Sequence, residues 1–312
     1  MATSAAPPGR CDPRRTLELR GGDRGAGPVI YWMSRDQRSR DNWALLHAQD
    51  LALAARRPLV VAFALAPAFL GATWRQYAFM LEGLKEVESD LAALGIGFRL
   101  LTGEPPAAVA AFARREGAQT IVSDFDPLRV KRGWVENLCR RVSCPVVEVD
   151  AHNIVPCRIA SPKLEFGAYT LRPKLRRLLG EFLTPFARVT AHPWNPPAAP
   201  ATDWDRVAAG LKADRGVGPV EGLKPGPAGG EAALRRFVAD RLAFYDEERN
   251  DPVADGQSNL SPWLHFGHLA PQRAALDVRA VDNVPAASRD AFLEELIVRR
   301  ELSDNFCFYN PS

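Results

Sequence analysis

Short apolar segments alternate with longer amphipathic ones between Pro28 and Asp150, and this alternation restricts the fold more than any other feature of the sequence. Strands that are apolar on both faces and alternate with helices are typical of a parallel sheet covered on both sides. The pattern predicts five strands, at 29–33, 59–65, 96–101, 120–123 and 145–149. It predicts the intervening helices at 42–57, 74–94, 105–117 and 127–141. We therefore expect an α/β doubly wound, five-stranded parallel sheet within residues 28–160.

The turn after the first predicted strand argues against two common nucleotide-binding functions. A dinucleotide-binding fold needs Gly-x-Gly-x-x-Gly there, because only glycine lets a pyrophosphate approach the backbone. The chain has Ser34 to Asn42 at this place, without a glycine, and it contains no Walker motif. Nicotinamide-dependent hydride transfer and P-loop phosphoryl transfer are therefore poorly supported.

Two different regions follow the predicted sheet. A basic helix is predicted at 170–183, whereas residues 192–230 are rich in proline, glycine and alanine, which prevents long regular structure. From Glu231 onward every predicted element is helical. These patterns divide the chain into a disordered leader (1–27), the α/β domain (28–160), a helix with an interdomain connection (161–230) and a helical domain (231–312).

The composition is that of a soluble globular protein from a reducing compartment. Hydrophobic residues make up 46% and charged residues 25%, and no apolar run approaches the ~20 residues that cross a bilayer. The five cysteines show no Cys-x-x-Cys spacing, which favours the cytoplasm over a disulfide-bonded secreted protein. The abundance of alanine, arginine, glycine and proline suggests a bacterial source. A formal charge of +3 is too small to indicate a nucleic-acid partner by itself.

The segment around Ser261 offers two kinds of ligand site. Ser261 before Pro262 is a suitable N-cap, and free backbone N–H groups and hydroxyls at such a helix start can hold a phosphate. A purely structural cap is the more common explanation of the same pattern. His265 and His268 have a metal-compatible spacing, but no cysteine or carboxylate nearby completes a site, so we expect no metal.

The last predicted helix begins at Phe292 and combines an apolar face with charged residues. From Phe292 on, apolar residues recur at the i, i+1, i+4, i+5 spacing of one helical face. The spacing predicts pairs between Glu295 and Arg299 and between Glu301 and Asn305 across neighbouring turns. Taken alone, it indicates a solvated helix with surface ion pairs.

Three segments in the helical half resemble a known family. Residues 294–306, Glu-Glu-Leu-Ile-x-Arg-Arg-Glu-Leu-x-x-Asn-Phe, resemble a signature of the class II cyclobutane pyrimidine dimer photolyases. Residues 258–267, Ser-Asn-Leu-Ser-Pro-Trp-Leu-His-Phe-Gly, are similar to the photolyase and cryptochrome loop that holds the FAD phosphates. Residues 245–252, Tyr-x-x-x-Arg-Asn-Asp-Pro, are close to the class II form of the segment before that loop.

The resemblance extends into the sheet domain. Residues 77–84 and 150–174 are similar to class II segments, although Arg158 and Leu164 depart from the family pattern. The resemblance implies an antenna-type α/β domain, for which a deazaflavin chromophore is expected, followed by an all-α FAD-binding domain. It also implies light-driven repair of cyclobutane pyrimidine dimers in DNA by electron transfer from reduced FAD. The partner would be UV-damaged DNA with the dimer flipped out of the duplex, bound by a monomer.

Roles follow from the resemblance residue by residue. Glu295 matches the glutamate that hydrogen-bonds the dimer and is the predicted catalytic residue; a carboxyl group in a desolvated pocket can donate such a bond. Arg249 matches an arginine that contacts the DNA backbone. The residues predicted to bind FAD are Tyr245, Ser258, Asn259, Leu260, Ser261, Phe292 and Arg299. Core packing for Phe292 and an ion pair with Glu295 for Arg299 remain as alternatives.

In the family, the helical domain continues past the segment that matches Phe292 to Tyr309. The resemblance therefore implies a C-terminally truncated FAD-binding domain. We expect this polypeptide to bind FAD weakly or not at all and to aggregate. Two other functions stay open: a cryptochrome-like flavin photoreceptor, which would bind flavin and leave dimers intact, and a non-catalytic remnant that retains only the α/β ligand-binding domain.

Overall fold

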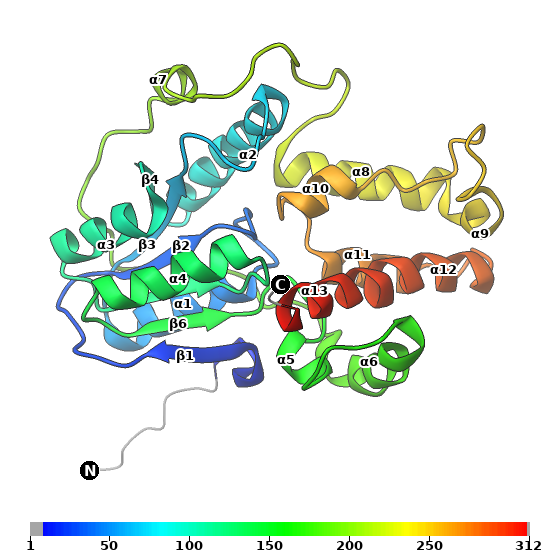
Figure 1. The fold of residues 1–312 in the computed structure, drawn as a ribbon, viewed down its shortest axis with the longest axis horizontal. Coiled ribbons are helices and arrows are strands. Elements are labelled where there is room, and N and C mark those ends of the chain that lie inside the picture. The colour runs from blue at the N-terminus through cyan, green and yellow to red at the C-terminus, as the bar shows by residue number, and fades with distance from the viewer. Residues whose placement is uncertain (1–8, 311–312) are drawn as a thin grey trace.

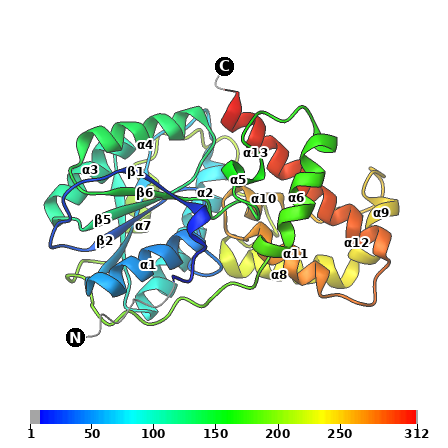
Figure 2. The same cartoon turned by 90° about the horizontal axis from the view of Figure 1, so that it is seen from below.

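The computed structural model describes residues 9–310, which form one mixed sheet with a helical region beside it (Figures 1 and 2). The strand order is β1-β6-β5-β2-β3-β4. The five predicted strands are present and parallel: β2 (Val29–Met33), β3 (Leu59–Leu65), β4 (Gly97–Thr102), β5 (Thr120–Asp124) and β6 (Val146–Val149). The predicted doubly wound α/β architecture is confirmed.

Helices cover both faces of this sheet. α1 (Trp43–Ala55) and α2 (Trp74–Ala93) pack on one face, and α3 (Pro105–Glu116) and α4 (Arg129–Arg141) pack on the other. Side chains alternate along a strand, so in β2 Tyr31 belongs to the first of these cores and Trp32 to the second. Because both faces are buried, the strands are the continuous apolar runs that the sequence shows.

The N-terminal segment corrects one prediction. The predicted disordered leader is wrong for residues 9–27, because β1 (Thr16–Arg20) pairs antiparallel with β6 and adds a sixth strand at the sheet edge. Before it, in the 3-10 turn η1 (Pro13–Arg15), the buried guanidinium of Arg15 donates to three backbone carbonyls of residues 150–154. An edge strand needs no apolar run, which is why the pattern did not reveal it. Residues 1–8 of the predicted leader lie outside the described residues.

The segment between the sheet and the helical region runs over the surface. α5 (Cys157–Ala160) and α6 (Ala168–Phe182) follow the sheet, and the chain then returns past α2 through the short α7 (Trp204–Ala209) (Figure 1). Trp204 fixes this path: its ring stacks on Phe98 with centroids 6.2 Å apart, and its Nε1–H donates to Glu88. The proline- and glycine-rich composition thus belongs to an ordered surface connection.

The helical region begins earlier than predicted. α8 spans Gly226–Asp240, so the helix starts within the glycine-rich segment and not at Glu231. Pro227 suits a first helical turn. The glycine at 230 allows a close approach to Trp263, since a Cβ there would lie 3.1 Å from the indole ring. The region continues, all helical, with η2 (Leu242–Phe244), α9 (Tyr245–Glu248), α10 (Ser261–His265), α11 (Pro271–Arg279), α12 (Ala286–Leu293), the π-helical η3 (Glu294–Arg299) and α13 (Arg300–Tyr309).

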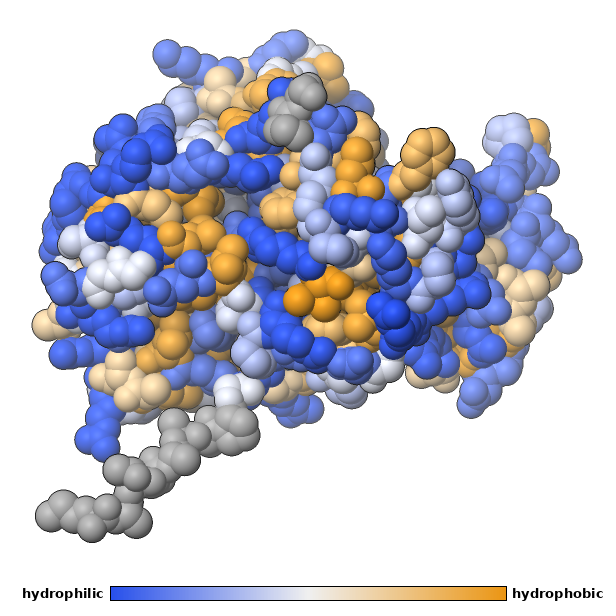
Figure 3. All heavy atoms as spheres, turned by 60° about the horizontal axis from the view of Figure 1, so that its bottom comes forward, coloured by the Kyte–Doolittle hydropathy of each residue, from blue (hydrophilic) through white to orange (hydrophobic). Residues whose placement is uncertain are grey.

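On one face of the molecule, hydrophobic side chains lie between hydrophilic ones (Figure 3). Among the described residues, Phe166 and Tyr169 are highly exposed, and their rings lie 6.4 Å apart at the start of α6. Beyond Glu231 the exposed large apolar side chains are few and well separated in sequence: Phe244, Val253 and Phe306. The predicted aggregation therefore stays a prediction. No described helix combines the length and the apolar character that a membrane span requires.

Candidate functional site

Four of the predicted site residues meet where α9 packs against α12 and η3. The Arg249 Nη1 atom lies 2.8 Å from Oε1 of Glu295. The Arg249 guanidinium also lies 6.0 Å from the centroid of the Tyr245 ring. The Tyr245 and Phe292 rings meet edge to face with centroids 5.5 Å apart. An aromatic pair thus supports an Arg–Glu ion pair.

Local structure explains this meeting. Tyr245 begins α9, and Arg249 is the residue that ends it, one turn later on the same side. The start of α9 is fixed to α12 because the Ser288 hydroxyl donates both to the Ala243 carbonyl and to the Asp246 carboxylate. This contact brings α9 alongside the helix that leads into Glu295.

The ion pair faces solvent. The side chains of Arg249 and Glu295 are 29% and 39% exposed. The hydrogen bond to Glu295 raises the pKa of Arg249, so this guanidinium is charged at any physiological pH. The expectation of a desolvated carboxyl group at Glu295 is wrong for this structure, in which Glu295 accepts a bond from Arg249. Both charged groups are accessible to a polyanion.

Phe292 and Arg299 occupy different environments from each other. Phe292 is 3% exposed and packs between Phe237, with ring centroids 4.8 Å apart, and Tyr245. This placement favours the core-packing alternative. Arg299 is mostly exposed, and its acidic neighbour is Glu294, at 4.0 Å, not Glu295. In the π-helical turn, residues five apart meet where residues four apart would meet in an α-helix.

The loop of residues 258–261 is open and anchored at one point. Leu260 is fully buried in the helical core, so its side chain acts as the anchor. Ser258 is half-buried, and Asn259, whose φ of 56° is left-handed, is exposed together with Ser261. In the part of the chain that the structure describes, neither serine hydroxyl makes a hydrogen bond. Ser261 is the first residue of α10 and not its N-cap, a position that Leu260 occupies.

This loop is attached to the Arg249 site. Gln257 Nε2 donates to the backbone carbonyl of Arg249 at 3.2 Å. Gly256 packs directly on Glu248, since a Cβ at Gly256 would lie 2.3 Å from the Cβ of Glu248. The predicted phosphate loop and the Arg249–Glu295 pair are therefore parts of one surface.

The second half of the signature helix has a role that the sequence did not indicate. Glu301, Asp304 and Asn305 are buried and join the helical region to the sheet domain. Glu301 Oε1 accepts from the Ile154 N–H at 2.7 Å, and both Asp304 oxygens pair with Arg35 at 2.8 Å. Asn305 and Glu301 were expected to pair across a turn, which is wrong: Asn305 instead bonds the backbone of residues 163 and 165. The solvated-helix interpretation therefore fails for α13.

Glu301 gives the protein a testable pH dependence. Burial raises the pKa of Glu301 from its ordinary value of 4.5 to about 8. The folded state therefore binds a proton that the unfolded chain releases, so the free energy of unfolding falls as pH rises from 4.5 towards 8. Glu301→Gln keeps an oxygen for the Ile154 N–H and removes the titration. We expect its urea midpoint to exceed that of the wild type above pH 8 and to depend less on pH.

Comparing the wild type with Glu301→Gln separates the pH dependence caused by Glu301 from that caused by a second buried group. Burial lowers the pKa of His152 to about 4, which makes stability rise with pH below the ordinary pKa of 6.5. This contribution is the same in the wild type and in Glu301→Gln. Parallel pH curves for the two proteins would contradict the assignment to Glu301.

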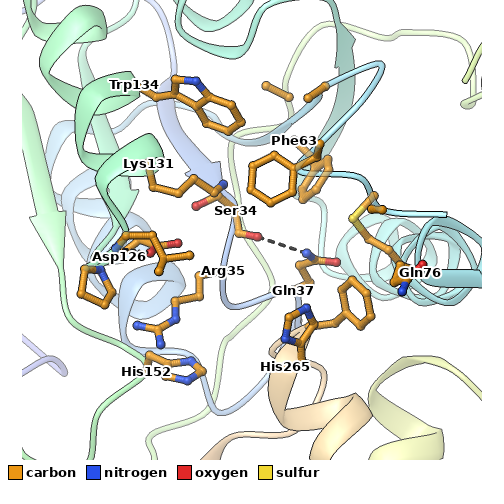
Figure 4. Close-up of a pocket in the computed structure, with 18 of the residues that line it drawn as sticks. Ser34, Arg35, Gln37, Phe63, Gln76, Asp126, Lys131, Trp134, His152 and His265 are labelled. Carbon is orange, nitrogen blue, oxygen red and sulfur yellow. Dashed lines mark hydrogen bonds between the residues drawn. The ribbon is translucent and has the colours of Figure 1, made fainter. Parts of the chain in front are cut away.

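A cavity of about 410 Å³ opens at the carboxyl ends of the central strands, between the two halves of the molecule (Figure 4). Its walls are largely aromatic and apolar, and the charged side chains of Arg35, Asp126 and Lys131 lie on one side. Its lining includes Arg35, Gln37, Phe63, Phe69, Tyr77, Asp126, Lys131, Trp134, His152, His265 and Asp304. Ligands of open α/β sheets bind at this edge. The residues that line the cavity come from segments far apart in the sequence, so no motif marks this site. Its location at the carboxyl ends of the parallel strands was the only indication that the sequence offered.

The polar side of the cavity carries balanced charge. Burial lowers the pKa of Lys131 and raises the pKa of Asp126. The Lys131 ammonium lies 4.9 Å from the centroid of the Trp134 ring. Burial would raise the pKa of Asp304, but Arg35 outweighs this effect and lowers it. The cavity thus suits a flat, mostly apolar ligand with a polar end.

Of the two histidines of the loop, His268 belongs to the packing, whereas His265 is exposed and lines the cavity. His268 is buried, accepts from the Gly226 N–H at 3.2 Å and stacks on Phe79 with centroids 5.3 Å apart. Residues 9–310 contain no group of three or more His, Cys, Asp or Glu side chains arranged to hold a metal ion.

Curated relatives share much of this sequence. The chain is 50% identical over 289 residues to a deoxyribodipyrimidine photo-lyase of Potorous tridactylus, covering 91% of this chain and 54% of that protein. It is 44% identical over 305 residues to the deoxyribodipyrimidine photo-lyase of Oryza sativa subsp. japonica, covering 93% and 60%. The chain therefore spans little more than half the length of these relatives. These sources do not support the predicted bacterial origin.

Solved structures share the fold, and a family model gives the assignment. A Synechocystis cryptochrome matches with a TM-score of 0.73 and 18% identity over 91% of this chain and 62% of that one. A class III photolyase from Agrobacterium tumefaciens matches with a TM-score of 0.68 and 19% identity over 94% and 60%. At such identities the likeness concerns the fold alone. The DNA photolyase family model matches residues 29–194, more than half of the chain, and the chain therefore belongs to the DNA photolyase family.

Proposed function

We propose that this chain serves light-driven repair of cyclobutane pyrimidine dimers in DNA, as a photolyase of the class II kind. The observation that carries the proposal is the exposed Arg249–Glu295 pair beside Tyr245 and the open loop of residues 258–261. An exposed guanidinium can bind a backbone phosphate, and the carboxyl group next to it can bond a base carbonyl. The names of the curated relatives agree with this activity.

The residues present fit one part of an FAD site. The Ser258 and Ser261 hydroxyls could bind phosphate oxygens, and the exposed Asn259 amide, which donates to Asp255 at 3.2 Å, keeps a second N–H for the same purpose. Gln257 holds this loop beside Arg249. Tyr245 would contact the nucleotide from α9. Reduced FAD, when bound, would supply the electron that splits the dimer under light.

The chain's own groups would then position the lesion. Arg249 would bind a phosphate next to the dimer and hold it at the α9 end of the site. Glu295, in its protonated form and released from Arg249, would donate a hydrogen bond to a dimer carbonyl on which negative charge grows. A dimer is poorly stacked and paired, which lowers the free energy needed to flip it out of the duplex.

We further propose that the cavity at the sheet edge holds a light-harvesting chromophore of the deazaflavin type. Its size, its aromatic walls and its polar end support a planar ring system. A photolyase from Sulfolobus tokodaii, with a TM-score of 0.66 and 17% identity over 91% of this chain and 60% of that one, is described as containing two FAD molecules, with the implication of a novel light-harvesting cofactor. We propose a cytoplasmic location, which the five free thiols support, and a monomer.

The test is the loss of dimers from UV-irradiated oligonucleotides under blue light, with the purified chain, FAD and a reductant. We expect dimers to disappear in the light and to persist in the dark. Flavin binding without dimer loss would indicate a cryptochrome-like photoreceptor. Neither flavin binding nor dimer loss would indicate a non-catalytic protein that keeps only the sheet-domain ligand site. Stoichiometric flavin absorbance in the purified chain would contradict the expectation of weak FAD binding.

A further inference from the structure

Two adjacent acids of η3 pair with arginines from two different helices. Glu294 is held by Arg172 of α6: Nε lies 3.0 Å from Oε2 and 3.1 Å from Oε1, and Nη2 lies 2.7 Å from Oε1. Glu295 pairs instead with Arg249 at the end of α9, at 2.8 Å. Because neighbouring residues of a helix point in different directions, this turn of the chain is held from two sides.

The turn that carries these acids is π-helical, between the α-helices α12 and α13. Single π-helical turns are rare and are frequent at functional sites, where the surrounding structure must stabilise them. Here the next three residues, 296–298, are buried in the helical core, which fixes one side of the turn. On the other side, Arg172 makes the close contacts to Glu294, and Arg299 lies at 4.0 Å. Without Arg172, Glu294 would keep only weaker electrostatic partners, the mostly exposed Arg299 at 4.0 Å and Arg176 of α6.

We infer that Arg172 is a positioning residue whose two-pronged hold on Glu294 fixes the π-helical turn and so places Glu295 opposite Arg249. Among residues 9–310, no hydrogen bond or ion pair joins Arg172 to Glu295 or Arg249, so it acts through Glu294. The consequence for DNA rests on the proposed function, whereas the effect on the Arg249–Glu295 pair does not.

The geometry of the pair argues against a purely incidental surface contact. Isolated exposed ion pairs are mobile and contribute little to stability. The planar guanidinium of Arg172 engages both carboxylate oxygens of Glu294, which restricts the orientation of both side chains. The hydrogen bond from Arg172 also lowers the pKa of Glu294, so the anchor stays ionised at neutral pH.

The first test observes the Arg249 side chain in the full chain by NMR of arginine Nε–H groups. The Arg249 signal is identified by its loss in Arg249→Gln. We expect Arg172→Gln to shift this signal towards that of a free arginine, because Glu295 no longer faces Arg249. The charge-reversed double variant Arg172→Glu/Glu294→Arg restores the pair with opposite polarity and should return the signal towards its wild-type position.

The matched control breaks another ion pair of α6. Glu181 accepts from Arg14 at 2.6 Å near the far end of the helix. Glu181→Gln therefore disturbs α6 to a similar degree without touching Glu294, and it should leave the Arg249 signal in place. An unchanged signal in Arg172→Gln, or an equal shift in Glu181→Gln, would overturn the inference.

The second test measures binding in the dark to duplexes with and without a pyrimidine dimer. We expect Arg172→Gln to lower the preference for dimer-containing DNA by about tenfold, because small misplacements of a binding group have effects of this order. Affinity for undamaged DNA should change little, since Arg249 remains. The Arg249 signal could shift in Arg172→Gln while the wild-type protein shows no preference for dimers. This result would uphold the positioning role and contradict the proposed function. An unaltered preference in a variant whose signal has shifted would overturn the link between them.

Discussion

An Asp304→Ala variant is expected to unfold at a markedly lower urea concentration than the wild-type chain, with a loss of about 3–5 kcal/mol in the free energy of unfolding. Asp304 and Arg35 join the helical region to the sheet domain by two contacts of 2.8 Å, with side chains only 8% and 17% exposed. Removing one partner leaves the other charge buried without compensation. Asn153, which donates to Asp304 at 2.9 Å, loses its acceptor as well.

Two further variants separate this mechanism from a general loss of packing. Arg35→Met/Asp304→Leu removes both charges and fills the space with apolar groups, so we expect it to be more stable than Asp304→Ala. Lys85→Ala breaks an exposed ion pair of α2 with Glu82 and should cost less than about 1 kcal/mol. A double variant as unstable as Asp304→Ala would show that the ion pair is not the cause.

The fold could be predicted wherever burial leaves a local pattern. The central strands β2 and β3 are apolar on both faces, so their sequences differ from everything around them. The edge strand β1 is held by backbone bonds to β6 and by the contacts of Arg15, which leave no periodicity. α8 was predicted to begin late because the glycines that fit against Trp263 have the composition of a linker.

The site was predictable only in part, for a different physical reason. The structure brings Tyr245, Arg249 and Glu295 together, as the resemblance implied, but spacing alone could not pair residues from α9 and η3. Spacing also misassigned Arg299, because a π-helical turn shifts partners by one position. Glu301 and Asp304 have the spacing of a solvated helix and are nevertheless buried, because their partners lie far away in the chain. Buried charged residues of this kind leave no local signal.

Replacing Glu295 by alanine is expected to abolish light-dependent dimer loss while strengthening the binding of undamaged DNA. In the structure the Glu295 carboxylate pairs with the Arg249 guanidinium at 2.8 Å, so a backbone phosphate must compete with this carboxylate for Arg249. Glu295→Ala frees the guanidinium and removes a negative charge from the surface that meets DNA. Repair should fall by about a hundredfold or more, because the variant lacks the group that bonds the dimer as charge develops on it. Dimer loss is measured under blue light and affinity in the dark.

Arg249→Gln should have the opposite effect on the binding of undamaged DNA. Together with Glu295→Ala and the double variant, it forms a double-mutant cycle. It should weaken the binding of damaged and of undamaged DNA alike. It should also reduce the steepness of the plot of log K for DNA binding against log salt concentration by about 0.9, the value for one phosphate contact. In the Arg249→Gln background, Glu295→Ala should no longer strengthen binding beyond the effect of lost charge. Asp290→Asn measures that effect, since Asp290 is an exposed acid of α12 without an ion pair in the described chain. The contrary result would be that Glu295→Ala weakens the binding of undamaged DNA as much as Arg249→Gln does. The two residues would then hold DNA as a unit, and the competition between carboxylate and phosphate would be refuted.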